Sequence, residues 1–165
     1  MKKYFFLLVF TLSSIVAFSQ DNVTTYYLIR HAEKDRTDKA NKNPNLKEKG
    51  EKRAKKWAEV FKDVNFDLVY ATNYNRTQQT AAPTAKSKKL KVLAYNPNKL
   101  FNKEFQKATK GKTVLVVGHS NTTPMLANKI LNKEKYKFIN DHNNANLYII
   151  TIIDNVKNSI LLKID

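Results

Sequence analysis

The strongest constraint on the fold is the way short apolar runs alternate with longer amphipathic stretches. Runs rich in β-branched and aromatic residues, as buried strands are, lie at residues 24–30, 66–72, 91–95, 113–117, 147–154 and 159–163. Stretches with the apolar spacing of helices lie at residues 46–61, 76–89, 99–109 and 122–131. Strands that alternate with helices predict an α/β fold, here a three-layer α/β/α sandwich with a mostly parallel central sheet.

The first twenty residues, 1–20, have the pattern of a secretory signal peptide. Lys2 and Lys3 precede an almost wholly apolar or small run at 4–18, and Ala17-Phe18-Ser19 places small residues at a cleavage site. The alternatives are a membrane anchor or a buried first helix, but this run is shorter than the ~20 residues that span a bilayer. We therefore expect an exported protein, periplasmic or secreted, with no stable membrane anchor after cleavage.

The remainder, residues 21–165, shows no internal repeat and no long linker, which predicts a single domain. The chain contains 30 basic and 14 acidic residues and no cysteine. The missing cysteine excludes a disulfide framework, a thiolate metal site and a cysteine nucleophile. The positive charge favours anionic partners. We expect no nucleic-acid binding, because the sequence has no known motif and no interleaving of aromatic and basic residues.

The residues that follow the strands point to phosphoryl chemistry. In parallel α/β sheets, ligands bind beyond the carboxyl ends of the strands. Arg30 and His31 follow the first predicted strand, Arg76 lies shortly after the second, and His119 follows the fourth. The chain has 3 His and four arginines, so two of each lie at this edge. The planar fork of arginine binds phosphate through paired hydrogen bonds, which lysine cannot provide.

Each of these residues also has a structural interpretation when it is taken alone. A histidine at a strand end can be a hydrogen-bonded loop residue, Arg30 a salt-bridged strand terminus, and Arg76 a solvated helix start. His142 lies in an Asn-rich loop at 141–146, and we expect a structural role for it. The lysine-rich stretches are typical of solvated helix faces. It is the joint placement of two histidines and two arginines that favours a functional site.

Three segments resemble the histidine phosphatase (phosphoglycerate mutase-like) superfamily. Arg30-His31-Ala32-Glu33 resembles its Arg-His-Gly-Glu signature, with Ala32 in place of the usual glycine. The segment at 71–81 resembles its arginine and Gln-Thr segment, with Asn73 in place of a turn proline. Gly118-His119-Ser120-Asn121 is similar to the segment of its second histidine. The resemblance covers essentially the whole mature chain and extends to the compact phosphohistidine phosphatase group.

The resemblance implies a metal-independent phosphatase that hydrolyses a phosphoric monoester or a phosphohistidine, with no cofactor. His31 would be the nucleophile and would form a phosphohistidine, which water then hydrolyses. Arg30, Arg76 and His119 would surround the phosphoryl oxygens, His119 in its protonated form once a dianion is bound. Asn121 could donate a further hydrogen bond to the phosphate. The expected partner is a phosphorylated small molecule or phosphoprotein.

The general acid is the open point of this resemblance. One branch of the family has an aspartate directly after the second histidine, where this chain has Ser120. In the mutase-like branch a glutamate follows the second arginine, and the candidate here is Glu104, whose alternative is a surface helix residue. Glu33 and Asp35 are nearer to His31 in sequence but have structural interpretations of their own. An enzyme without a dedicated acid favours good leaving groups. The alternative function is a non-catalytic phosphate- or polyanion-binding module of the same fold.

Overall fold

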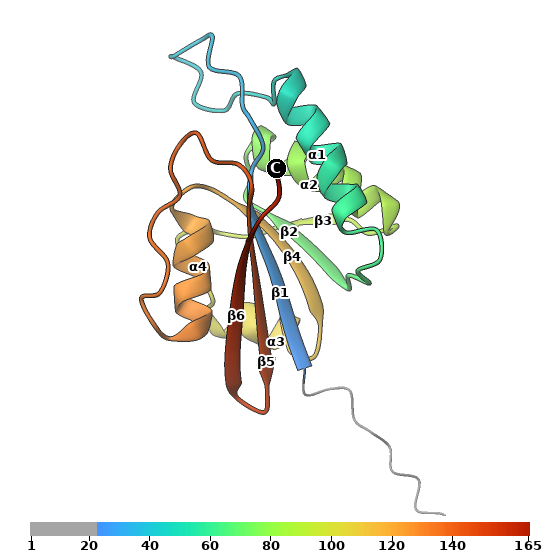
Figure 1. Cartoon of the computed structure of the whole chain (residues 1–165), viewed down its shortest axis with the longest axis vertical. Helices are drawn as coiled ribbons and strands as arrows, with labels where there is room; N and C mark the ends of the chain where they lie inside the picture. Colours follow the sequence, from blue (N-terminus) through green and yellow to red (C-terminus); the bar gives the residue numbers. More distant parts are fainter. Residues whose placement is uncertain (1–22) are drawn as a thin grey trace, which may run out of the picture.

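The computed structural model describes residues 23–165, so the expected signal peptide lies outside the described residues. These residues form one mixed six-stranded sheet with four helices (Figure 1). The strands are β1 (Val23–Arg30), β2 (Leu68–Ala71), β3 (Val92–Ala94), β4 (Thr113–Gly118), β5 (Asn146–Ile153) and β6 (Val156–Lys163). The helices are α1 (Glu48–Val60), α2 (Asn75–Ser87), α3 (Lys103–Thr109) and α4 (Thr122–Leu131). In this part of the chain, no helix has the length and apolar character needed to cross a bilayer.

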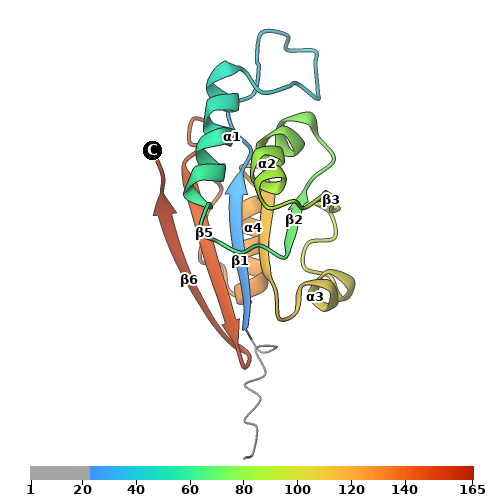
Figure 2. The ribbon, with the colours of Figure 1, turned by 90° about the vertical axis from the view of Figure 1, so that its right-hand side faces the viewer.

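The order of the strands in the sheet is β3-β2-β4-β1-β5-β6. The first four are parallel to one another, whereas β5 is antiparallel to β1, and β6 is antiparallel to β5. Figure 2 shows the carboxyl ends of β1, β2 and β4 at the same end of the sheet. The register is what positions the site: Arg30 lies opposite Gly118, and Ala71 lies opposite Val117. The residues that follow these strands therefore meet at one edge.

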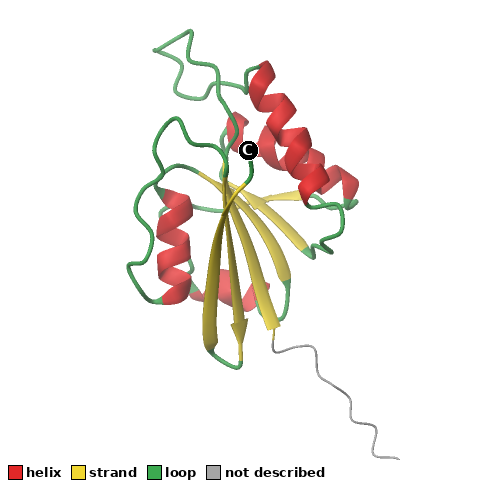
Figure 3. Cartoon of the chain, viewed as in Figure 1, coloured by secondary structure: helices red, strands yellow, loops and turns green. Residues whose placement is uncertain are grey.

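Helices cover both faces of the sheet, which explains the continuous apolar run in β4 (Figure 3). Successive residues of a strand point to opposite faces. Val114 and Val116 pack in the core with α3 and α4, while Leu115 and Val117 pack in the core with α1 and α2. The predicted three-layer α/β/α sandwich is confirmed.

The element boundaries differ from the predicted ones where a side chain caps a helix. A helix was expected from residue 99, but α3 begins at Lys103. The side chain of Asn102 accepts a hydrogen bond from the backbone N–H of Phe105 at 2.9 Å. Such a cap satisfies a donor that the first helical turn leaves unpaired, and it fixes the start of the helix.

Gly50 brings α1 against the segment that follows β1. A Cβ atom at this position would overlap the backbone carbonyl of Glu33 and lie 3.0 Å from its backbone N. Because backbone cannot rotate away as a flexible side chain can, we expect Gly50→Ala to destabilise the protein by about 1–3 kcal/mol, although alanine favours helix. Urea unfolding measures this change. As control, Lys55→Ala on the exposed face of α1 should leave the free energy of unfolding unchanged or slightly raised. A Gly50→Ala variant more stable than the parent would contradict the close contact.

Candidate active site

The two histidines at the sheet edge lie side by side. His31 follows β1 and His119 follows β4, and their ring centroids are 5.5 Å apart in an edge-to-face arrangement. The backbone N–H of His31 donates to the carbonyl of Gly118 at 2.9 Å, which continues the ladder between β1 and β4 by one residue. The parallel register therefore brings together two histidines that are far apart in sequence.

His31 is buried and its ring is held in one tautomer. Its side chain is only 4% exposed, and Nδ1 lies 2.7 Å from the carbonyl oxygen of Ala32. Because a carbonyl oxygen can only accept, Nδ1 carries the proton, and in the neutral ring Nε2 keeps the lone pair. Burial, together with the nearby Arg30 and His119, lowers the pKa of His31 to about 3. The imidazole is therefore neutral at pH 7, which is the nucleophilic form.

The second histidine, His119, is also neutral in the unliganded protein. Its Nε2 lies 2.9 Å from the Thr72 hydroxyl, and the ring of Tyr74 packs edge-on at 5.1 Å. Burial, followed by the charges of Arg76 and Arg30, lowers the pKa of His119 to about 4. The protonated form that the resemblance implied for a phosphate complex therefore requires the negative charge of the bound dianion.

Arg30 is held by a loop that comes from the far end of the sequence. Its side chain is 2% exposed, and Nη1 donates to the carbonyl oxygens of Asn140, Asp141 and Asn143 at 2.9–3.0 Å. Nη2 donates to the Asp141 carboxylate at 2.5 Å. The buried Nε has no hydrogen-bond partner within residues 23–165. The loop thus fixes the guanidinium, and its Nε–H is left without a partner.

Arg76 lies close enough to both histidines that its charge lowers the pKa of each. Its guanidinium stacks over the ring of Tyr74, with 4.4 Å between the guanidinium carbon and the ring centroid. Nη1 makes one long contact, 3.4 Å, with the carbonyl oxygen of Lys42, and the buried Nε has no partner among the described residues. Buried donors are nearly always paired in folded proteins. Two arginines with unpaired Nε–H groups beside two histidines are therefore suited to bind an anion.

The other two predicted site residues, Glu104 and Asn121, make no side-chain hydrogen bond to the histidines or arginines of this cluster among the described residues. Glu104 is exposed on α3 and lines a pocket with Tyr95 and Asn96 that contains neither histidine. Asn121 precedes α4, its side chain is exposed, and it makes no capping hydrogen bond. The predicted roles of Glu104 as general acid and Asn121 as phosphate ligand are supported by no contact in the described residues.

The carboxylates that do lie beside His31 are both held by arginines. Glu33 accepts from Arg53 Nε with both oxygens at 3.0 Å. Asp141 bridges Arg30 and Arg36, at 2.5 and 2.6 Å. Although burial raises the pKa of Asp141, the hydrogen bonds from the two arginines outweigh burial and lower the pKa below its usual range. Asp141 is thus an anion near pH 7, unsuited to donate a proton.

The contact between Asp141 and Arg30 was not predicted, because the sequence argument considered only His142 in this loop and expected a structural role for it. The signal that could have found it is a single acidic residue in an otherwise Asn-rich segment. Within residues 23–165, no group of three or more His, Cys, Asp or Glu side chains could hold a metal ion.

A sequence model of the histidine phosphatase superfamily (branch 1) matches residues 26–96. This stretch contains Arg30, His31 and Arg76, whereas His119 lies beyond it. Comparison with functionally curated proteins finds no match for this chain.

Solved structures of low sequence identity share the fold over most of the chain. A phosphoglycerate mutase from Bacillus anthracis is 18% identical with a TM-score of 0.65, and the match covers 87% of this chain and 94% of that one. A mycobacterial glucosyl-3-phosphoglycerate phosphatase is 12% identical with a TM-score of 0.66, over 87% and 100% of the two chains. The protein histidine phosphatase SixA, solved with tungstate, is 12% identical with a TM-score of 0.66, over 84% and 96%. Residues 26–96 thus match the sequence model of the histidine phosphatase superfamily, and the chain shares its fold with these solved structures.

Proposed function

We propose that the protein is a phosphatase that hydrolyses its substrate through a phosphohistidine on His31. The observation that carries this proposal is the state of that residue: a buried, neutral imidazole with Nδ1 bound to the Ala32 carbonyl. The unpaired Nε–H groups of Arg30 and Arg76 provide donors for phosphoryl oxygens. Two of the structurally similar proteins are named as phosphatases, and one of them was solved with tungstate, an oxyanion.

The first step transfers the phosphoryl group to the protein. His31 Nε2 attacks phosphorus, so that an N–P bond forms while the bond from phosphorus to the leaving oxygen or nitrogen breaks. Arg30 and Arg76 donate to the equatorial oxygens and stabilise their charge. His119 takes up a proton when the dianion binds and becomes a third donor. In the second step water attacks phosphorus, the N–P bond breaks, inorganic phosphate leaves and His31 is neutral again.

The surroundings of the site favour substrates with good leaving groups. Glu33 and Asp141 are both engaged by arginines, and Glu104 lies elsewhere, so no carboxylate among these is placed to protonate a leaving alkoxide. A phosphohistidine, a phosphoanhydride or an aryl phosphate depends less on such a proton than an alkyl phosphomonoester does. We infer that the substrate is a phosphohistidine, a phosphoanhydride or an aryl phosphate rather than an alkyl phosphomonoester. The lack of a placed general acid among Glu33, Asp141 and Glu104 also favours a second candidate function, a phosphate-binding module that has lost turnover.

We also propose that the enzyme needs no metal ion and that it acts outside the cytoplasm, periplasmic or secreted. The first part of this proposal is supported by the side chains at the site, where arginines and histidines alone can neutralise a phosphoryl group. The second part is supported by the sequence of residues 1–20, with two lysines before an apolar run.

Hydrolysis of p-nitrophenyl phosphate tests the proposed function, because its leaving group departs with little help from an acid. We expect the purified protein to release p-nitrophenol, orthovanadate to inhibit this release, and EDTA to leave the rate unchanged. Phosphate binding with no turnover would favour the binding module instead. Loss of the activity in EDTA, restored by a divalent metal, would contradict the metal-independent mechanism.

A further inference from the structure

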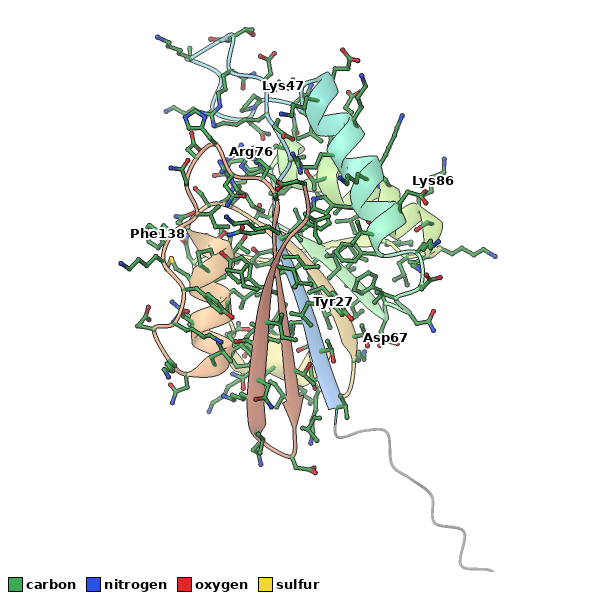
Figure 4. The ribbon with its side chains drawn as sticks, viewed as in Figure 1. Tyr27, Lys47, Asp67, Arg76, Lys86 and Phe138 are labelled. Carbon is green, nitrogen blue, oxygen red and sulfur yellow. The ribbon has the colours of Figure 1, made fainter. Side chains whose placement is uncertain are left out.

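A small polar pocket opens directly beside His31. Its volume is about 170 Å³, and its walls include His31, Arg30, Lys34, Arg36 and Lys47. These residues come from the end of β1, the segment after it, and the residue before α1. Figure 4 shows Lys47 and Arg76 at the same end of the molecule, above the carboxyl ends of the strands. The pocket is therefore continuous with the phosphoryl site and lies on one side of it.

The pocket holds more positive charge than its own carboxylates can neutralise. Five Lys and Arg side chains line it, against two carboxylates. Both carboxylates are already engaged, Glu33 with Arg53 and Asp141 with Arg30 and Arg36. Within residues 23–165, neither Lys34 nor Lys47 forms an ion pair. These two ammonium groups are the cations of the pocket that remain available to a ligand.

The backbone holds Lys34 in a fixed place next to the nucleophile. Lys34 forms an isolated antiparallel bridge with Leu46, and the Lys47 N–H donates to the Glu33 carbonyl at 3.0 Å. Lys34 is half-buried, and burial followed by the charges of Arg76 and Arg36 lowers the pKa of its ammonium group. Like charges this close to one another repel, and a bound anion would reduce the repulsion.

We propose that the pocket formed by Lys34, Arg36 and Lys47 binds a second anionic group of the substrate while its phosphoryl group lies against His31. This inference rests on the proposed function and specifies its substrate class: a small phosphorylated molecule that carries a second phosphate or a carboxylate. The size of the pocket suits one further group of this kind. The pocket opens beside Arg30, so the second group must lie close to the scissile phosphoryl group.

Two aryl phosphates of nearly the same shape test the proposal: 3-carboxy-4-nitrophenyl phosphate and its carboxyl methyl ester. The first presents a second anion, and the ester does not. We expect kcat/KM for the compound with the free carboxylate to exceed that for its methyl ester by about tenfold or more. Charge-assisted hydrogen bonds in a partly buried pocket provide a difference of this size. In the double variant Lys34→Gln, Lys47→Gln this ratio should fall to about one.

A matched double variant separates the pocket from the overall charge. Lys55→Gln with Lys103→Gln removes the same charge from exposed positions outside the pocket, on α1 and α3. It should keep the tenfold ratio. A ratio near one in the parent protein, or a ratio that survives removal of Lys34 and Lys47, would overturn the proposal. If the protein hydrolyses neither of the two aryl phosphates, the proposed catalytic function itself is refuted.

Calorimetry provides a readout that needs no turnover. Methylenediphosphonate carries two linked phosphonate groups and resists hydrolysis, whereas methylphosphonate carries one. We expect the parent protein to bind the bisphosphonate at least tenfold more tightly, and Lys34→Gln, Lys47→Gln to lose most of this difference. Equal affinity for the two ligands in the parent protein would show that the pocket accepts no second anion.

Discussion

Replacing His31 with asparagine should lower the turnover of p-nitrophenyl phosphate by on the order of a thousandfold or more, as loss of a nucleophile does. The reason is chemical: an amide cannot form the N–P bond on which both steps depend. Asparagine is the suitable replacement, because its side-chain N–H can still donate to the Ala32 carbonyl, as Nδ1 of His31 does at 2.7 Å. The measurement is kcat from steady-state release of p-nitrophenol.

The exposed His142 provides a matched control for this variant. It lies in the loop that holds Arg30, and its backbone N–H donates to the Asn140 side chain. His142→Asn should therefore keep the activity of the parent protein. Rapid acid quenching should also trap an acid-labile phosphoprotein in the parent and none in the His31→Asn variant. Turnover within tenfold of the parent after loss of His31 would rule out the phosphohistidine mechanism.

The secondary structure could be predicted from the sequence because the signal is local. The spacing of Leu46, Gly50, Arg53 or Ala54, Trp57 and Phe61 predicts one buried helix face, and all of these residues except the half-buried Arg53 are buried. The same holds for the apolar run at 113–117, which forms the inner strand β4. Strand direction is not local: nothing in the composition of β5 and β6 distinguishes their antiparallel pairing from the parallel pairing of the other strands. Only the overall α/β alternation and the resemblance indicated the architecture.

The site could be predicted only as far as the strand ends define it. His31 and His119 follow strands that pair in parallel, so the rule that ligands bind at carboxyl ends was enough to place them together. The support of Arg30 could not be predicted in this way, because its partner Asp141 lies 111 residues further along the chain. A hydrogen bond between a strand end and a distant irregular loop leaves no periodic pattern in the sequence.

The protonation state of the two histidines could not be predicted from the sequence either. Motif similarity assigns a role to His119 but does not reveal that burial and two arginines hold it neutral before a ligand arrives. In the proposed mechanism, the site would meet an incoming dianion with neutral imidazoles and charged guanidinium groups. The proton that His119 needs is then taken up together with the ligand.

Lowering the pH from 6.5 to 5 should destabilise the folded protein by about 1–2 kcal/mol for each of these histidines. In the unfolded chain a histidine has a pKa near 6.5, whereas the pKa is about 3 for His31 and about 4 for His119 in the folded protein. In this pH range the unfolded state therefore binds protons that the folded state does not. The free energy of unfolding then rises with pH, by up to ~1.4 kcal/mol per unit for each histidine, and levels off above 6.5.

Urea unfolding of the parent and of His119→Gln at pH 5, 5.5, 6 and 6.5 measures this dependence. The variant should lose about half of the slope, because one of the two imidazoles no longer takes up a proton on unfolding. A flat stability profile between pH 5 and 6.5 would mean that water reaches both rings, which would remove the physical basis for a neutral nucleophile in a dry site.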